Sequence, residues 1–274
     1  MKITALAENV STTEDLGSEH GLSLFIETEA HKLLFDTGQG SLFAENAVKL
    51  GVDLKQVERC VISHGHYDHG GGLRTFLNLN TVAPVFIAQK AFGDYYANRA
   101  DGPKEYIGLD QTLLPNERFR FTDGYLKIEE GLELFSTVTG QTLVPSGNVD
   151  LFEKTGDTFT PDNFAHEQNL IISENGITVL IAGCAHKGII NIVESFHALK
   201  GKYPDYVVGG LHLYNRASGG SEDTEPVVAI GKYLVSTGST YYTCHCTGED
   251  SFNRLKTVMA GKIEYLSTGN QINF

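Results

Sequence analysis

The order of apolar and polar positions along the chain predicts alternating strands and helices. Short runs rich in Val, Ile, Leu and Phe, each bounded by Gly or polar residues, are typical of strands buried in a sheet. Patterns with a period of about 3.6 residues predict helices between them. The strands are expected at residues 21–27, 32–35, 57–62, 84–88, 170–172, 178–182 and 206–208, and the helices at 41–50, 70–77, 189–199, 226–236 and 251–259. This alternation predicts the α/β class, with helices on the faces of mixed sheet structure.

The length and the absence of a linker favour one domain. A chain of 274 residues can form one large α/β domain, and neither a Pro/Ser-rich stretch nor a block of charge divides it. Residues 94–156 mix turn residues with short apolar runs and show no sustained period. We therefore predict a single domain over residues 1–274, with an insertion around 94–156 that shapes substrate access.

The net negative charge and the short apolar segments of the chain disfavour nucleic acid and membranes as partners. The net charge of -13 disfavours binding to nucleic acid or to anionic lipid. The N-terminus turns polar before an apolar signal region can build, and no later apolar segment reaches the length of a membrane span. The sequence predicts a cytoplasmic protein that acts on a small molecule, with no nucleic acid or membrane as partner. A homodimer is compatible with the frequency of twofold assemblies among soluble proteins.

The four cysteines are Cys60, Cys184, Cys244 and Cys246, which are too few and too irregularly spaced for a disulfide framework. Reduced thiols are expected. Cys244 and Cys246 flank His245 and resemble half of a structural zinc site, but no second Cys/His pair with zinc-finger spacing completes it.

The richest chemistry lies in the run His64-Gly65-His66-Tyr67-Asp68-His69, which follows an apolar strand and precedes three glycines. Alternating positions can point His64 and His66 together, while Asp68 and His69 face a neighbouring point. Two metal ions can then lie side by side. A mixture of imidazole and carboxylate suits Zn, Fe or Mn, and two ions about 3.5–4 Å apart can share an activated hydroxide.

The pattern His-X-His-X-Asp-His after a strand resembles the signature of the metallo-β-lactamase superfamily. The resemblance implies an αββα four-layer sandwich and two divalent metal ions, with zinc expected first and iron or manganese as alternatives. Asp36, after the apolar run 33–35, resembles the early aspartate that supports the metal loop in this family. An aspartic protease is disfavoured, because the chain has one Asp-Thr-Gly where such an enzyme needs two.

The resemblance also implies ligands in the second half, where this chain departs from the family pattern. Cys184 in Gly183-Cys184-Ala185-His186 stands where the bridging aspartate is expected. His186 is predicted to complete the site of His64 and His66, with His166 as a weaker alternative. Cys184 either ligates metal as a thiolate, which favours zinc, or is an unligated buried cysteine.

Two further histidines follow strand-like runs. His245 is predicted to be the last ligand, beside Asp68 and His69, with Cys244 and Cys246 pointing away from the metals. A core histidine satisfied by the backbone is the alternative for His245. Asp68 and His212 are the catalytic candidates, for moving a proton or stabilising an oxyanion, although His212 can equally be structural.

These motifs together resemble the branch of dihydropterin ribofuranosyl-aminobenzene phosphate synthases of methanopterin biosynthesis. Relatives on one fold often differ in chemistry, so the function predicted first is a metal-dependent hydrolase that uses a metal-activated hydroxide on a small ester or phosphoester. A pterin-phosphate transferase is the alternative, and a non-catalytic metal-binding protein is the third. Redox relatives with dinuclear iron are disfavoured, because they carry a carboxylate where this chain has His66 and they pair with a flavin domain.

Overall fold

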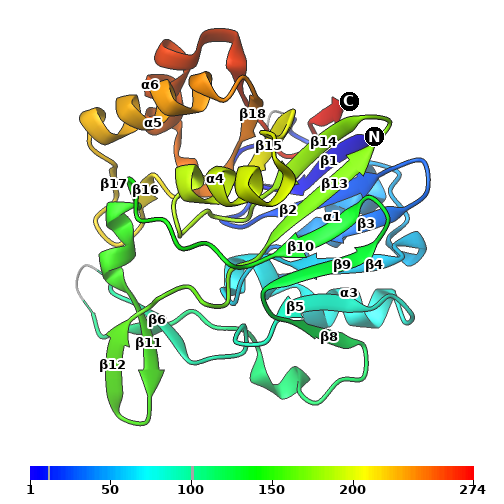
Figure 1. Cartoon of the computed structure of the whole chain (residues 1–274). Coiled ribbons are helices and arrows are strands. Elements are labelled where there is room, and N and C mark those ends of the chain that lie inside the picture. Colours follow the sequence, from blue (N-terminus) through cyan, green and yellow to red (C-terminus); the bar gives the residue numbers. More distant parts are fainter. Residues whose placement is uncertain (12, 100–101) are drawn as a thin grey trace. The chain divides into compact units, whose positions relative to one another are not determined.

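The computed structural model describes residues 1–11, 13–99 and 102–274 (Figure 1). These residues form two compact units, each built on one seven-stranded sheet. The first unit contains Met1–Gly93, Gly108–Asp123 and Leu266–Phe274. The second unit contains Asp94–Ile107 and Gly124–Tyr265.

The sheet of the first unit changes from antiparallel to parallel pairing at its middle strand. The pairs among the first four strands in the sheet order are antiparallel, and the pairs from β3 onward are parallel. The order is β20 (Gln271–Asn273), β1 (Lys2–Ala7), β2 (Ser23–Glu27), β3 (Lys32–Phe35), β4 (Arg59–Ile62), β5 (Val85–Ala88) and β8 (Phe119–Thr122). Parallel strands bring their carboxyl ends to one edge of the sheet, so loops that follow them lie together.

Both faces of this sheet are buried, which explains the continuous apolar runs of its strands. Leu34 belongs to the hydrophobic cluster that includes Phe43 of α1 (Leu42–Lys49) and Phe76 of α3 (Leu73–Leu79). The neighbouring Leu33 and Phe35, which point the other way, are fully buried as well. The unit also contains the short helix α2 (Tyr67–Gly70) and the 3-10 turns η1 (Leu54–Gln56) and η2 (Gln111–Leu113).

The sheet of the second unit repeats the same pairing pattern with different strands. Its first four strands pair antiparallel, and its last four pair parallel. The order is β9 (Tyr125–Glu129), β10 (Leu132–Phe135), β13 (Asn169–Glu174), β14 (Ile177–Ile181), β15 (Tyr206–Gly209), β18 (Thr240–Thr243) and β19 (Ile263–Tyr265).

Helices α4 (Ile189–Lys200), α5 (Thr224–Ser236) and α6 (Glu249–Met259) cover this sheet and share one apolar cluster with it (Figure 1). In α4 the apolar side chains Ile189, Ile192, Val193 and Phe196 recur at helical spacing and are buried. Gly201 ends the helix with φ of 71°, a left-handed conformation that glycine adopts without a side-chain clash.

Smaller elements complete the second unit. They are the four-stranded sheet of β12 (Thr158–Pro161), β11 (Leu151–Thr155), β6 (Tyr95–Ala97) and β7 (Glu105–Tyr106), the pair β16 (Tyr214–Asn215) and β17 (Gly220–Ser221), and the 3-10 turns η3 (Ser146–Asp150), η4 (His245–Thr247) and η5 (Ala260–Lys262). Residues 94–156 supply strands to three different sheets, which explains why their sequence shows no single period. The single domain and the role of this segment in substrate access stay predictions.

The predicted class and the predicted elements are confirmed. Each expected strand and helix is present, with ends that differ by up to three residues, as for the strand expected at 57–62 and found as Arg59–Ile62. Among the described residues, no helix is long and apolar enough to cross a membrane.

Phe196 is fully buried in the apolar cluster of the second unit. We expect Phe196→Ala to lower the free energy of unfolding by about 3–5 kcal/mol, because it removes apolar contacts and leaves a cavity. Leu199→Ala on the same helix is the control, since Leu199 is 42% exposed and its truncation is expected to cost about 0.5 kcal/mol or less. Urea denaturation followed by circular dichroism measures both, and equal losses would contradict this view of the core.

Candidate metal centre

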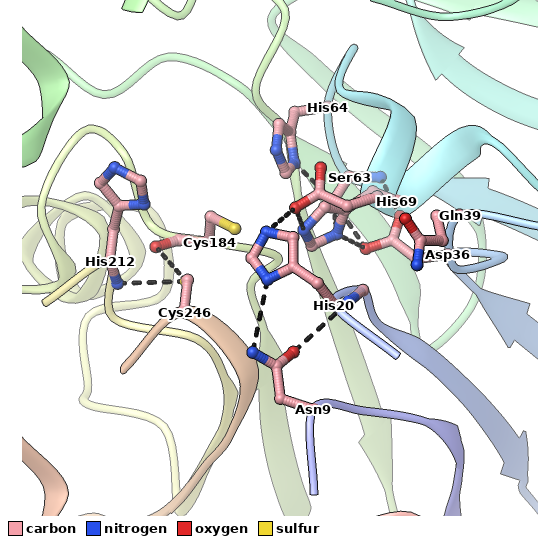
Figure 2. A network of polar contacts seen from close by, with 12 residues as sticks. Asn9, His20, Asp36, Gln39, Ser63, His64, His69, Cys184, His212 and Cys246 are labelled. Atoms are coloured by element: carbon pink, nitrogen blue, oxygen red, sulfur yellow. Dashed lines mark hydrogen bonds and ion pairs between the residues drawn. The ribbon is translucent and has the colours of Figure 1, made fainter. Parts of the chain in front are cut away.

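In the first unit, the buried carboxylate of Asp36 organises the loop that follows β4. It accepts hydrogen bonds from the backbone N–H of Ser63 (2.7 Å), from Ser63 Oγ (2.7 Å) and from His69 Nδ1 (2.6 Å). Figure 2 shows these contacts around Asp36. Because β3 and β4 are parallel neighbours, the residue after β3 lies next to the loop after β4. The role predicted for Asp36 as a support of the metal loop agrees with this geometry.

Proton counting assigns the tautomers of two histidines. Ser63 Oγ has one hydrogen, which it donates to the carboxylate of Asp36, so its 2.9 Å contact with His64 Nδ1 requires His64 Nδ1–H as the donor. His69 Nδ1–H likewise donates to Asp36. Neutral His64 and His69 therefore both carry their lone pair on Nε2, the form in which an imidazole binds a metal ion.

The three imidazoles of the loop lie close together. The ring centroids of His64 and His66 are 4.6 Å apart, and those of His64 and His69 are 4.1 Å apart. The glycines that follow permit tight backbone packing: a Cβ on Gly71 would lie 2.5 Å from the carbonyl oxygen of Gln39, and one on Gly72 would lie 2.2 Å from that of Thr37. Because these glycines have no side chain, the loop can pack directly against the backbone of the segment after β3.

Asp68 is also held by a neighbour. His20 Nε2 lies 3.1 Å from Asp68 Oδ2, and Asn9 Nδ2 lies 3.4 Å from the other ring nitrogen of His20. Figure 2 shows Asn9 and His20 beside the loop. The sequence pattern does not predict His20 at this site, since a histidine before the strand Ser23–Glu27 belongs to no recognisable metal motif.

In the second unit, four candidate donors follow three adjacent parallel strands. Cys184 and His186 follow β14, His212 follows β15 and His245 follows β18. The ligand atoms of Cys184, His186 and His212 all lie within 4.8 Å of one another, and so do those of Cys184, His245 and Cys246. Cys184 is thus common to two groups of donors.

Two polar side chains fix the position of His186. Asn148 Nδ2 donates to the His186 carbonyl (2.7 Å), so its Oδ1 accepts from His186 Nδ1–H (3.1 Å), which leaves the lone pair on Nε2. Glu167 accepts from the backbone N–H groups of His186 (2.6 Å) and Lys187 (3.1 Å). Burial raises the pKa of Glu167, although these two N–H groups oppose the rise. Phe164 stacks on the His186 ring with centroids 4.5 Å apart.

Cys246 points toward the donors, so the prediction that it faces away from them is wrong. His245 has φ of 53°, and the 3-10 turn that starts there rotates the next side chain back toward Cys184. Burial opposes ionisation of Cys246, yet the pKa of its thiol lies well below the usual value, because contacts with Cys184 and His212 and the nearby ring of His245 favour the thiolate.

Left-handed backbone conformations mark these strand ends. Asp36, Ala185, His212 and His245 have φ between 50° and 60°, which is uncommon for residues other than glycine. Such conformations cost about 1–3 kcal/mol each and gather at sites where geometry matters more than stability. The candidate site of each unit is therefore built on strained turns.

His166 has a different environment. Its Nε2 lies 3.0 Å from Asp162 Oδ2, and its ring packs on Tyr95 with centroids 4.1 Å apart. This buried polar contact and the ring contact fit a histidine that supports the structure around Glu167.

The chain is similar in sequence and structure to known proteins. The family model of the Metallo-beta-lactamase superfamily matches residues 16–201, which include the His64–His69 loop and His186. The chain belongs to the metallo-β-lactamase superfamily. The predicted fold is thereby confirmed, as is the predicted family.

The names of similar proteins in this superfamily describe different activities. The chain is 27% identical to a 7,8-dihydropterin-6-methyl-4-(beta-D-ribofuranosyl)-aminobenzene-5'-phosphate synthase of Methanocaldococcus jannaschii, over 100% of this chain and 97% of that protein. It is 31% identical to a metal-dependent hydrolase of the beta-lactamase superfamily of known structure, with a TM-score of 0.84 and coverage of 100% and 99%. The structure of zinc-bound PqqB from Methylobacterium extorquens shares the fold alone, with 11% identity, full coverage of both chains and a TM-score of 0.58. The predicted resemblance to the methanopterin branch is confirmed.

Metallo-β-lactamase superfamily proteins bind divalent metals, and the donors of this chain fit such ions. In the first unit His64 and His69 present the Nε2 lone pairs that metal ligation requires, and so does His186 in the second unit. The first unit groups the predicted residues His64, His66, Asp68 and His69, and the second groups Cys184, His186, His212 and His245.

We expect Asp36→Asn to weaken metal binding by about 10–100-fold, because an amide presents a donor to Ser63 Oγ or His69 Nδ1 and disturbs the tautomers of His64 and His69. Competition with a zinc-binding dye measures the affinity. Asp53→Asn is the matched control, since Asp53 is an exposed carboxylate that accepts from the backbone of Lys55. An Asp36→Asn protein with unchanged zinc affinity would show that the loop does not depend on this carboxylate.

Proposed function

We propose that the protein is a metal-dependent hydrolase that binds two divalent metal ions. The observation that carries the proposal is the position of Cys184, which belongs to both donor groups of the second unit, as a bridging ligand must. The superfamily and the tautomers of His64 and His186 support it. The proposed ligands are His64, His66, Asp68, His69, Cys184, His186 and His245.

The donor set favours zinc. Imidazole and thiolate together suit zinc better than the oxygen-seeking ions, with iron and manganese as alternatives. When bound, two such ions supply Lewis acidity and lower the pKa of water, which is the chemistry that ester and phosphoester hydrolysis needs.

Two residues of the chain can handle protons. His212 is half-buried, its ring centroid lies 4.1 Å from that of His186, and its Nδ1 has no hydrogen-bond partner among the described residues. A proton on His212 can therefore pass to a leaving group. Asp68 is the second candidate, because its 3.1 Å contact with His20 Nε2 connects it to a partly exposed ring that can relay a proton.

A cleft in the second unit offers room for a small substrate beside His186. Its volume is about 440 Å³, and its walls include Val138, Val144, Phe164, Asn148 and Lys187. This size is typical of sites for small molecules. The apolar walls can hold an organic group, and the Lys187 ammonium can face an anionic one.

Metal analysis of protein purified without a histidine tag tests the centre. We expect about two metal ions per chain, and fewer in His64→Ala, His186→Ala and His245→Ala because each substitution removes a proposed ligand. His31→Ala is the control, since His31 pairs with Glu58 through Nδ1 at 3.0 Å and belongs to neither donor set. One ion or none in the wild type, or metal content indifferent to His186→Ala, would reject the two-metal centre.

A second function is favoured by one comparison, the similarity to the aminobenzene phosphate synthase over 97% of that relative. In a transferase of this type an arylamine would attack an activated pterin, and water would have to be excluded. Metal-loaded protein should be supplied with a panel of phosphoesters, and separately with a pterin diphosphate and an arylamine, and the products identified by mass spectrometry. We expect metal-dependent release of phosphate or alcohol from a panel member. A coupled pterin–arylamine product, without hydrolysis, would replace the hydrolase by the transferase.

A further inference from the structure

We propose that Cys246 is a metal ligand, so that Cys184, His245 and Cys246 form a sulfur-rich donor set for a zinc-like ion. The inference rests on the proposed metal centre. It adds Cys246 to the proposed ligands, which are the donors of the His-X-His-X-Asp-His pattern together with Cys184, His186 and His245. It also assigns the chemical class of the ion, which is one that prefers thiolate ligands.

The three donors have the burial and the spacing of a metal site. Cys184, His245 and Cys246 are 3%, 1% and 4% exposed, and their ligand atoms lie within 4.8 Å of one another. Around a tetrahedral zinc, ligand atoms are separated by about 3.5–4 Å, given bonds of about 2.3 Å to sulfur and about 2.0–2.1 Å to nitrogen. Small side-chain rotations therefore suffice to bring the three atoms to one ion. Binding replaces the hydrogen of each thiol by the metal and releases it as a proton.

A second observation concerns the surroundings of the Cys246 sulfur. The backbone N–H of His212 donates to Cys246 Sγ at 3.2 Å, a contact of the kind that stabilises a thiolate. Gly210 makes room for the sulfur, because a Cβ at this position would lie 2.5 Å from Cys246 Sγ. Figure 2 shows Cys246 between two backbone groups: its Sγ accepts from the N–H of His212 and donates its S–H to the carbonyl oxygen of Cys184 at 3.7 Å, a hydrogen that metal binding would release. The strand end after β15 is thus shaped to receive this sulfur atom.

Cys60 shows how a purely structural cysteine of this chain differs. Cys60 belongs to the apolar cluster of the first unit, and burial raises the pKa of its thiol well above the usual value. Cys184 and Cys246 lie outside the apolar cluster formed by described residues of the second unit, among backbone polar groups and histidines. The two kinds of environment fit an inert thiol in the first case and a pair of ligands in the second.

Cobalt substitution of the full chain tests the proposal, because Co²⁺ bound to thiolate absorbs in the near ultraviolet and Co²⁺ bound to nitrogen and oxygen alone does not. The wild type should show this absorption, and Cys246→Ser should lose roughly half of it and bind zinc at least about 10-fold more weakly. Cys184→Ser should lose the other half. Cys60→Ala is the control and should change neither reading. Circular dichroism checks the fold, and Cys246→Ala provides a second variant if the serine substitution prevents folding.

The outcomes separate this inference from the proposed function. Unchanged thiolate absorption and zinc affinity in both Cys246 variants would show that Cys246 is not a metal ligand. In that case, about two metal ions per chain in the metal analysis of the wild type would still support the proposed two-metal centre. A wild-type mass lower by about 2 Da under non-reducing conditions, with Cys184 and Cys246 joined in one peptide pair, would assign the two sulfurs to a disulfide and also overturn the proposal. A wild type that binds no metal would reject both.

Discussion

The hydrogen bonds to the Asp36 carboxylate are the interactions on which the donor loop of the first unit depends. A buried carboxylate is costly unless donors surround it, and Asp36 receives them from the backbone and hydroxyl of Ser63 and from His69. In return it fixes the proton of His69 directly and that of His64 through Ser63. One negative charge thus decides which nitrogen of two imidazoles is left for a metal ion. In the second unit, two separate side chains hold His186: Asn148 accepts from its Nδ1–H, and Glu167 accepts from its backbone N–H.

In both units the donors lie in loops that follow parallel strands. Strands that run in one direction deliver successive loops to one sheet edge, so residues far apart in sequence, such as Cys184 and His245, become neighbours. Left-handed turns at Asp36, Ala185, His212 and His245 then aim the side chains. Local strain of this type is tolerated because the buried strands on either side hold the turns in place.

Strong periodicity and local motifs made much of this predictable. The predicted strand at 32–35 has the bounds of the observed strand Lys32–Phe35, because a short apolar run between polar residues predicts a buried strand. The loop His64–His69 was recognised because its donors are adjacent in sequence. His20 and Asn148 were missed, since each contacts its partner across a large separation in sequence that no short pattern records. The direction of Cys246 was predicted wrongly because alternation along a strand does not hold through a left-handed turn at His245.

The repeated pairing pattern of the two sheets leads to a difference in how each donor set responds to a local change. Counted along each sheet, β3 corresponds to β14, β4 to β15 and β5 to β18. The first sheet concentrates its donors behind one strand, where they share a single backbone segment and a single carboxylate. The second sheet distributes them behind three strands, each with its own turn. A substitution at Cys184 or at Cys246 is therefore expected to alter one turn while the others keep their geometry. A backbone change in the first donor loop therefore affects all of its donors together, whereas a change behind one strand of the second sheet affects the donors of a single turn.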